Sequence, residues 1–543
     1  MSWGRLAALG SLVAIVLVVV LGMTVLGGGA SPTASPQAIV SPSTPPAVTP
    51  TPEPTAAPTP TPDPLTTIPI VPVADWRSTA DAITGADVAA IANGKSPRWK
   101  AIEVVADEQD AVLASLGGAV TSGAALGEKV VTAPDAATLM TDLAAHRDRL
   151  AFMRADQVGP GVRALGWNGA SLFGIHRLQW VADWTLTARL PAVPPDAGSA
   201  FVPYDPATTA TMFAAGDLGY DRTIALVVLK LGFGVDYPYD GGTARITQST
   251  CCSSRGWPVP TIVSTGNAGA VRDLITTADL ALANSEEPTP DKWVYHDTGT
   301  VFTGNPALLA GVANAGFDLV GCANNHIGDA GRAGIMQTLA SLAKVKVAAF
   351  GCGKDLDAAR VPAVYDLNGT KIAILAYDSI AAKAYGATAT TIGSAPLTEE
   401  SVQADVAAAR AAGAQVVVVF PHWGVEYTFG PSAYQSRFAH LMIDAGADMV
   451  IGNHPHWVQS VEIYKGRPIW YALGNFTFDQ SWSESTLEGV SLEITFRGGA
   501  LVQARMNPHV LVKASQPNLL DADSGYSHVL GPVFKASGSL LTW

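Results

Sequence analysis

The stretch YQSRFAHLMIDAGADMVIGNHPH, residues 434–456, decides the fold that we expect for the larger part of this chain. Apolar residues recur at helical spacing in its first half, which predicts a helix with one buried face. That face consists of Phe438, Leu441, Met442 and Ala445. The short apolar run DMVI that follows is typical of a buried strand, and this strand leads into His454 and His456. Helix followed by strand predicts the βαβ units of an α/β protein.

The same pattern, an apolar strand that ends in a polar side chain, recurs upstream. The runs are ATMFAAGD, ADLALANSEEP, FDLVGCANNH and AQVVVVFPHWG, and their polar residues are Asp217, Glu286, Asn325, His326 and His422. Ligands of α/β sheets bind beyond the carboxyl ends of strands, so we expect these side chains to converge with His454 and His456. Imidazole, carboxylate and amide groups suit Mn, Fe or Zn, which predicts a site for one or two divalent metal ions.

Each of these residues also has a simpler explanation. Asp217 can cap a following helix, Asn325 can form a turn, and His422 can be a hydrogen-bonded core residue. Of the neighbours Glu286 and Glu287, we expect one to be a solvated charge. His440 falls inside the predicted helix and is interpreted as structural. The other histidines show no comparable setting, and these are His146, His176, His296, His509 and His528.

Composition excludes some classes of protein. A chain of 543 residues is too long for one core and predicts about three domains. The formal net charge of −13 argues against nucleic acid as a partner, because such proteins present a basic face. A mean hydropathy of +0.24 argues against disorder over most of the length.

The N-terminal region has two segments of distinct composition. Residues 6–30 carry no charged side chain and are long enough for a membrane-spanning helix, which needs about twenty apolar residues. We therefore expect residues 1–30 to be a single-pass anchor in the cell membrane, with the bulk of the chain extracytoplasmic. A cleaved signal, and hence secretion, is the alternative. Residues 31–74 are rich in Pro and Thr and predict an extended linker.

Three further segments follow the linker. Residues 75–205 alternate helical and strand-like runs and predict a small α/β domain, in which ITGADVAAIANGKSPRW resembles a segment of periplasmic solute-binding proteins. A plain packing domain is the alternative. Residues 206–500 form the main α/β domain, and residues 501–543 are expected as a C-terminal extension packing on it. Adjacent Cys251 and Cys252 rarely bridge, whereas Cys322 and Cys352 end apparent strands, so they are either neighbours or free buried thiols.

Six ordered motifs in residues 210–496 resemble the CapA-like family of bacterial capsule, or poly-γ-glutamate, synthesis proteins. The motifs are AGDLGYDR, ADLALANSEEP, AGFDLVGCANNHIGDAG, HWGVEY, DAGADMVIGNHPHWVQSVEIY and YALGNFTFD. The fold of that family is similar to the calcineurin-like metallophosphatases. The resemblance therefore implies a four-layer α/β/β/α sandwich and a metal-dependent hydrolase or transferase.

The resemblance also implies a role for each matching residue. The implied ligands of one ion are Asp217, Glu286 and His456, and those of the other are Glu286, Asn325, His422 and His454. His326 matches a histidine that protonates a leaving group, Asp329 would orient it, and Arg222 would hold an anionic substrate group. The Asp-x-His of metallophosphatases reads Asp217–Leu218–Gly219 here, so one ligand is missing and a single ion is an alternative to two. Glu286 also replaces the usual bridging Asp.

Three functions fit this resemblance. The first is a hydrolase or transferase acting on an envelope polymer, such as poly-γ-glutamate, or on a phosphoester. The second is a non-catalytic assembly or export component of anionic capsule polymer synthesis, with other capsule-synthesis subunits as partners. The third is a solute-binding sensor that uses the region around residues 75–200.

Overall fold

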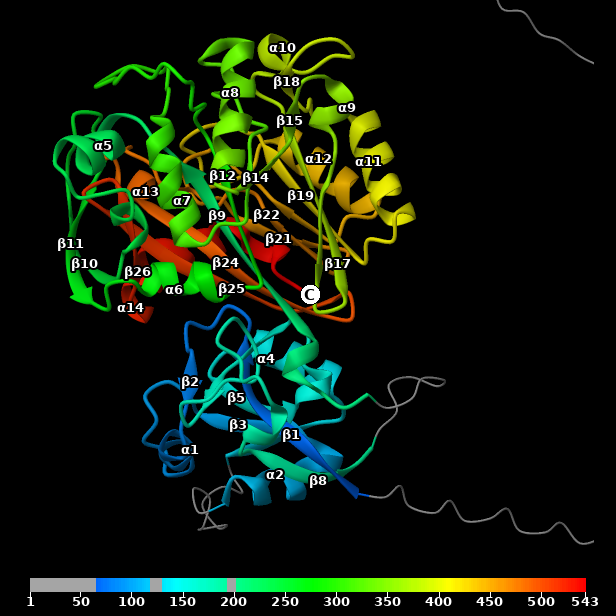
Figure 1. Cartoon of the computed structure of the whole chain (residues 1–543). Helices are drawn as coiled ribbons and strands as arrows, with labels where there is room; N and C mark the ends of the chain where they lie inside the picture. The colour runs from blue at the N-terminus through cyan, green and yellow to red at the C-terminus, as the bar shows by residue number, and fades with distance from the viewer. Residues whose placement is uncertain (1–64, 118–128, 193–201) are drawn as a thin grey trace, which may run out of the picture. The chain divides into compact units, whose positions relative to one another are not determined.

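A computed structural model describes residues 65–117, 129–192 and 202–543, coloured from blue to red in Figure 1. The expected anchor, residues 1–30, and residues 31–64 of the expected linker lie outside the described residues. Within those three ranges, no helix combines the length and the apolar character needed to cross a membrane.

The N-terminal part of the described chain is a mixed sheet with three helices. The sheet order is β4-β3-β5-β1-β6, and β8 also pairs with β1. The strands are β1 (Leu65–Asp75), β3 (Ala101–Val105), β4 (Val130–Ala133), β5 (Arg149–Arg154), β6 (Val162–Ala164) and β8 (Thr187–Pro191). The helices are α1 (Gly85–Ala92), α2 (Gln109–Ser115) and α4 (Ala136–Ala145). Strand β3 is parallel to β4 and β5, whereas β1 is antiparallel to its partners.

Strand β1 corrects the expected end of the linker, because residues 65–74 belong to the sheet. Pro69 and Pro72 suggest a spacer, since proline cannot donate a hydrogen bond to a ladder. Ile70 and Val71, however, are fully buried in the core of this domain. Their burial favours the strand in spite of the two prolines.

The rest of the chain contains two large sheets. The first has the order β11-β10-β26-β25-β24-β9-β12-β13-β14, with β23 beside β9. Its strands are β9 (Thr209–Leu218), β10 (Thr243–Thr250), β11 (Val259–Gly266), β12 (Leu280–Ser285), β13 (Leu319–Gly321), β14 (Ala348–Phe350), β23 (Asn475–Thr477), β24 (Glu488–Arg497), β25 (Ala500–Val512) and β26 (Gln516–Leu520). Strands β9, β12, β13 and β14 run parallel.

The second sheet has the order β16-β17-β19-β20-β22-β21. Its strands are β16 (Ala363–Leu367), β17 (Thr370–Asp378), β19 (Val416–His422), β20 (Met449–Ile451), β21 (Val461–Tyr464) and β22 (Arg467–Trp470). The four central strands are parallel. The second sheet therefore has a parallel centre, and the first has four parallel strands at one end, β9, β12, β13 and β14. The carboxyl ends of these parallel strands can carry a site.

The two sheets enclose one apolar core, and helices cover their outer faces. Met212 of β9 and Val418 of β19 belong to the same core cluster. The next residue of β9, Phe213, packs outward with α7 and α8, and Val419 packs with α11 and α12. These helices are α7 (Leu309–Ala315), α8 (Gly331–Lys344), α11 (Glu399–Ala411) and α12 (Ala433–Asp444), seen beside the strands in Figure 1. The layers thus run helix, sheet, sheet, helix, and the expected mixed α/β class is confirmed.

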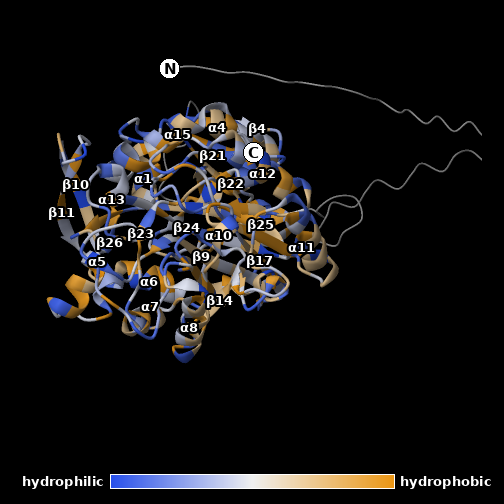
Figure 2. Ribbon diagram, turned by 90° about the horizontal axis from the view of Figure 1, so that it is seen from above, coloured by the Kyte–Doolittle hydropathy of each residue, from blue (hydrophilic) through white to orange (hydrophobic). Residues whose placement is uncertain are grey.

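The helix expected at the start of the decisive stretch is α12. Ser432 caps it, and its buried face includes Phe438 and Met442. Strand β20 follows and ends three residues before His454. Figure 2 shows apolar and hydrophilic residues alternating along the covering helices, as expected when one face of a helix is buried.

Residues 501–543 differ from the expected extension. Strand β25 pairs with β24 along its length, from Arg497 opposite Ala500 to Glu488 opposite Val510. Strand β26 then joins β25 to β10. The segment therefore builds the larger sheet instead of packing on a finished domain. The chain ends with α14 (Ala522–Ser524), the π-helix η9 (Gly525–Leu530) and α15 (Gly531–Ser537).

The four cysteines lie close together in two pairs. Cys322 follows β13, and a disulfide joins it to Cys352 across a Cα–Cα distance of 5.8 Å. The expected neighbourhood of these two strand ends is thus present, and the alternative of free thiols is wrong for them. The sulfur atoms of Cys251 and Cys252, which are adjacent in the chain, also lie side by side.

Candidate metal centre

The carboxyl ends of the parallel strands place the candidate ligands. Asp217 is the penultimate residue of β9, Glu286 directly follows β12, and His422 ends β19. The register pairs Asn284 of β12 with Asp217 of β9, so the two carboxylate-bearing strand ends are side by side. All three side chains are almost completely buried.

His454 and His456 lie in the turn after β20 with φ angles of 100° and 58°. A non-glycine residue in this region costs about 1–3 kcal/mol and persists where surrounding structure enforces it. Gly452, which begins the turn, fits tightly, because a Cβ there would lie 2.1 Å from the Tyr471 carbonyl oxygen. The strained turn aims two imidazoles into the interior.

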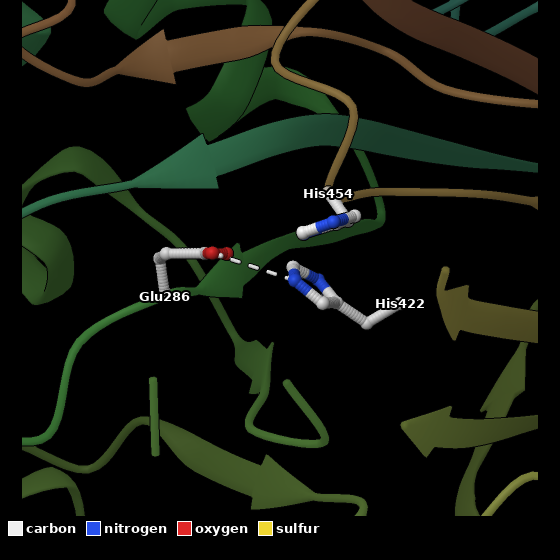
Figure 3. A group of neighbouring side chains, drawn as sticks. All are labelled: Glu286, His422 and His454. Carbon is white, nitrogen blue, oxygen red and sulfur yellow. Dashed lines mark ion pairs between the residues drawn. The ribbon is translucent and has the colours of Figure 1, made fainter. Parts of the chain in front are cut away.

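The carboxylate and the imidazoles converge on one point (Figure 3). One ligand atom from each of Glu286, His422 and His454 lies within 4.8 Å of the other two. His422 Nε2 is 3.4 Å from Glu286 Oε1 and 2.7 Å from Asn325 Oδ1. The rings of His422 and His454 are 4.9 Å apart between centroids.

Two asparagines that were not predicted from the sequence hold the candidate ligands in place. Asn284 Nδ2 donates to Asp217 Oδ1 at 2.7 Å and to Glu286 Oε2 at 2.5 Å. Asn475 Oδ1 lies 2.9 Å from His456 Nδ1, whose distance to Asp217 Oδ2 is 3.4 Å. One feature of the sequence indicates Asn284 as a site residue: it stands two residues before Glu286, so both side chains point to the same face of an extended chain.

The site contains polar atoms that lack a partner. Asp217 Oδ2, Glu286 Oε1 and His454 Nδ1 are buried, and none has a hydrogen-bond partner among the described residues. Buried polar side-chain atoms in folded proteins are normally paired. Two carboxylate oxygens and an imidazole nitrogen match the donor set of Mn, Fe or Zn, so the residues fit a divalent cation.

Burial and neighbouring charges alter the pKa values of the group. Burial, reinforced by the Glu286 charge, raises the pKa of Asp217. Burial also acts to raise the pKa of Glu286, but the nearby His422 outweighs it and the net pKa is lowered. Burial acts to lower the pKa of His456, but Asp217 raises it to about 9. Burial and the other imidazoles hold the pKa of His454 well below its usual range, so His454 is in the neutral form that binds metal.

Asp329 and Arg222 have defined contacts near the predicted proton donor. Asp329 Oδ2 lies 2.8 Å from His326 Nδ1 and accepts a 2.8 Å hydrogen bond from Phe302 N. The Arg222 guanidinium lies 4.2 Å from the centre of the Phe302 ring and forms an ion pair with Asp479. Asp479 therefore already neutralises the charge of Arg222. A substrate anion would contact Arg222 as predicted only by sharing the guanidinium group with Asp479.

Two simpler explanations from the sequence are wrong. Asp217 caps no helix, because helix α5 (Arg222–Ala225) begins five residues later and Asp221 caps it. Glu287 is only 2% exposed and accepts a 2.6 Å hydrogen bond from Tyr220 N, so it is not a solvated charge. Both neighbouring glutamates are thus buried, one in the site and one beside it.

An aromatic cluster borders the site on the side of His456. Tyr427 stacks on His456 with 6.1 Å between ring centroids. Trp257, Trp457 and Trp482 each contact Tyr427, at ring centroid distances of 5.6, 6.3 and 6.1 Å. These partly buried rings, which are inclined to one another, form an apolar border next to the candidate ligands.

Fold and site together define a mixed α/β protein with a buried group of candidate cation ligands at the carboxyl ends of parallel strands. Residues 211–480 match the family described as "Bacterial capsule synthesis protein PGA_cap", and this region of the chain belongs to that family. The expected relationship to CapA-like proteins is confirmed.

Three curated relatives resemble part of this chain. The PGA biosynthesis protein CapA of Bacillus subtilis is 33% identical over 218 residues, which is 40% of this chain and 57% of the relative. The capsule biosynthesis protein CapA of Bacillus anthracis is 31% identical, covering 40% of this chain and 54% of the relative. A probable polyglutamine synthesis accessory protein of Mycobacterium tuberculosis is 34% identical over 169 residues, covering 29% and 44%. The chain thus spans about half the length of the relatives it matches.

Solved structures with a partial likeness include two nucleotidases. The NAD nucleotidase of Haemophilus influenzae has a TM-score of 0.33 and 15% identity, covering 61% of this chain and 57% of that one. The 5'-nucleotidase precursor of Thermus thermophilus also has a TM-score of 0.33 and 15% identity, covering 60% and 58%.

Proposed function

We propose that this chain is a metal-dependent hydrolase or transferase that takes part in the synthesis of an anionic capsule polymer, such as poly-γ-glutamate. The observation that carries the proposal is that three buried atoms, Asp217 Oδ2, Glu286 Oε1 and His454 Nδ1, make no hydrogen bond within the described structure. Each of the two carboxylate oxygens lies 3.4 Å from an imidazole nitrogen. The names of the relatives support the connection to capsule polymers. The cation is Mn, Fe or Zn, in one or two copies.

The residues that would hold the cation come from both sheets. They are Asp217, Glu286, Asn325, His422, His454 and His456. When bound, the cation would lower the pKa of a water and stabilise the negative charge that develops on phosphoryl or carbonyl oxygens. Asn284 keeps the Asp217 and Glu286 carboxylates in position through its two donated hydrogen bonds. Asn475 fixes the ring of His456 from the other side.

His326 would supply a proton to the leaving group. Its Nδ1 is 2.8 Å from Asp329 Oδ2, so Nε2 is the ring nitrogen free to donate. Asp329 is therefore a positioning residue, and His326 is the residue that contacts the substrate.

The substrate class follows from charge. The chain carries a net charge of −13, which repels a polyanion over most of the surface. A divalent cation between the two sheets provides local positive charge, which favours a phosphoester or a carboxylate-rich polymer at this point. The Tyr427 cluster would support the apolar part of such a substrate.

Metal content provides the first test. Full-length protein is expected to contain stoichiometric metal by mass spectrometry, and a His454→Ala/His456→Ala variant is expected to lose the metal bound at this centre. His440→Ala is the control, because His440 is a partly buried histidine outside the site whose ring contacts a carboxylate, Glu462, at 2.8 Å. Wild-type protein that binds no Mn, Fe or Zn after reconstitution would disprove the proposal.

Turnover provides the second test. His326→Ala is expected to keep its metal but to lose activity on phosphoesters or γ-glutamyl amides, whichever the wild type cleaves. Unchanged turnover would exclude His326 as the proton donor. Asp329→Ala is expected to lower kcat more than it changes KM, because the His326 ring loses the contact that orients it.

The alternative is a non-catalytic assembly or export component. The description of the Mycobacterium relative as an accessory protein favours it. Under this alternative the metal is bound but no substrate turns over, and loss of the metal reduces polymer export. Polymer length distinguishes the two, since only a hydrolase or transferase changes it in a purified system.

We also propose an extracytoplasmic location, with residues 1–30 as an anchor in the cell membrane. The Cys322–Cys352 disulfide supports it, because disulfides persist in oxidising compartments. Cell fractionation tests the anchor: the chain is expected in the membrane fraction, and recovery from the culture medium would favour a cleaved signal.

A further inference from the structure

A second group of metal-ligating side chains lies outside the region that matches the capsule family. Glu484 begins the short helix α13 (Glu484–Leu487), Glu488 begins β24, and His528 belongs to η9. All three positions follow residue 480, where the family match ends. None of them belongs to the candidate metal centre.

The three side chains meet at close range. One ligand atom from each of Glu484, Glu488 and His528 lies within 4.8 Å of the other two. His528 Nδ1 is 2.5 Å from Glu484 Oε1. The second oxygen of Glu484 accepts a 2.6 Å hydrogen bond from Ser249 Oγ, which fixes the direction of the carboxylate.

Glu488 gives independent evidence for a ligand. The residue is only 4% exposed, and its Oε1 has no hydrogen-bond partner within the described ranges. Burying an unpaired carboxylate is costly, and a second carboxylate nearby increases the cost through repulsion. In this chain Glu484 is that second carboxylate. A cation between the two removes both penalties.

We propose that Glu484, Glu488 and His528 form a second divalent-cation site, which binds Zn²⁺ or Mn²⁺. Two carboxylates and one imidazole match the mixed oxygen and nitrogen ligands of these ions. Ser249 serves as an outer partner that orients a ligating carboxylate. The site fastens the C-terminal η9 to the start of β24 and to α13.

This site is connected to the candidate metal centre through one residue. Thr486 lies between Glu484 and Glu488, and its carbonyl accepts a 2.9 Å hydrogen bond from Asn475 Nδ2. The other end of the Asn475 amide contacts His456. A cation bound by Glu484 and Glu488 therefore fixes the segment that positions a ligand of the first site. The second site does not depend on the function proposed for the first.

Metal stoichiometry tests the second site separately. The full-length protein is stripped with a chelator, reconstituted with Zn²⁺ alone or Mn²⁺ alone, and its bound metal is measured. A Glu488→Gln/His528→Ala variant is expected to bind one ion fewer per chain than the wild type. The His454→Ala/His456→Ala variant is expected to retain that ion. His440→Ala, which breaks a similar histidine–glutamate pair, is expected to bind as many ions as the wild type.

The outcomes separate the two sites. Equal stoichiometry in the wild type and in folded Glu488→Gln/His528→Ala would overturn the second site while leaving the first intact. If the double variant does not fold, Co²⁺ absorption of a His422→Ala/His454→Ala/His456→Ala variant decides, because this variant has no imidazole ligand left at the first site. A spectrum of cobalt bound to nitrogen and oxygen supports the second site, and the spectrum of free cobalt overturns it.

Discussion

At the scale of single residues, His509 shows how burial alone controls a titration. It is 1% exposed, and its Nε2–H donates to the Asn475 carbonyl at 2.9 Å. Burial lowers its pKa from 6.5 to about 4. The folded protein therefore keeps this ring neutral, whereas the unfolded chain binds a proton below about pH 6.5. Stability contributed by the neutral ring is present above that pH and is lost as the pH falls toward 4.

We predict that replacing His509 with Gln removes this pH dependence. The wild type is expected to lose about 3 kcal/mol more unfolding free energy than His509→Gln between about pH 7 and about pH 4. Urea unfolding at both pH values measures the difference. His146→Gln, at an exposed position, should behave like the wild type. Parallel losses in the wild type and His509→Gln would show that His509 is not buried in the neutral form.

The second prediction at this scale concerns Asn284. An Asn284→Ala variant removes the two hydrogen bonds that hold Asp217 and Glu286. Outer partners of metal ligands typically change metal affinity by about 10–100-fold, so we expect a loss of that size. Competition with a chromophoric chelator measures it. Asn314→Ala, which removes an exposed hydrogen bond to Asp236, is the control and should leave affinity unchanged. Wild-type affinity in Asn284→Ala would show that the carboxylates need no support.

At the scale of elements, the sequence predicts helices and strands best where one periodicity dominates. The stripe containing Phe438 and Met442 predicts α12, and the apolar run before His422 predicts β19, as observed. Strand β1 was assigned to the linker because Pro69 and Pro72 interrupt it. Strand β25 was missed because its place in the sheet depends on pairing with β24, and distant pairing leaves no local pattern.

A close approach between two elements gives the third prediction. Strand β9 passes the turn before β23 so closely that a Cβ on Gly216 would lie 1.9 Å from the Gly474 carbonyl oxygen. That oxygen belongs to the backbone and cannot move as a side chain can. We expect Gly216→Ala to reduce the unfolding free energy by about 1–3 kcal/mol or more and to displace Asp217, the next residue.

Thermal unfolding and metal content of Gly216→Ala measure both effects. Gly430→Ala is the control, since the described structure leaves the space around its Cβ open to at least 4 Å. Wild-type stability together with wild-type metal content in Gly216→Ala would show that β9 and this turn can separate without cost.

At the scale of the whole molecule, the sequence predicts the candidate ligands of the site better than the residues that hold these ligands in position. Strand ends in a parallel α/β sheet converge by topology, and Glu286 and His422 meet as expected. Asn475 is different. It begins β23, and its side chain contacts His456 only because the tertiary fold brings β23 to the turn after β20. The group of Glu484, Glu488 and His528 was missed for a similar reason. His528 is 44 residues from Glu484 and reaches it only through the path of the C-terminal segment.

The disulfide between Cys322 and Cys352 gives the last prediction, which concerns the compartment of the whole molecule. It closes a loop with a sequence separation of 30 residues, joining the end of β13 to β15 (Cys352–Gly353). A cross-link over a loop of this size stabilises the fold by about 3–4 kcal/mol, mainly by restricting the unfolded chain. A Cys322→Ser/Cys352→Ser variant is expected to lose about that much unfolding free energy.

Denaturant unfolding with and without a reducing agent checks this loss and its cause. The reducing agent should destabilise the wild type and leave Cys322→Ser/Cys352→Ser unchanged, apart from any effect through Cys251 and Cys252. Cys251→Ser/Cys252→Ser isolates that contribution.

Mass spectrometry of peptides from protein isolated from cells under thiol-blocking conditions then reports the compartment. Because cytoplasmic thiols remain reduced, a linked Cys322–Cys352 peptide indicates an oxidising compartment, and free thiols at both positions would contradict the extracytoplasmic location.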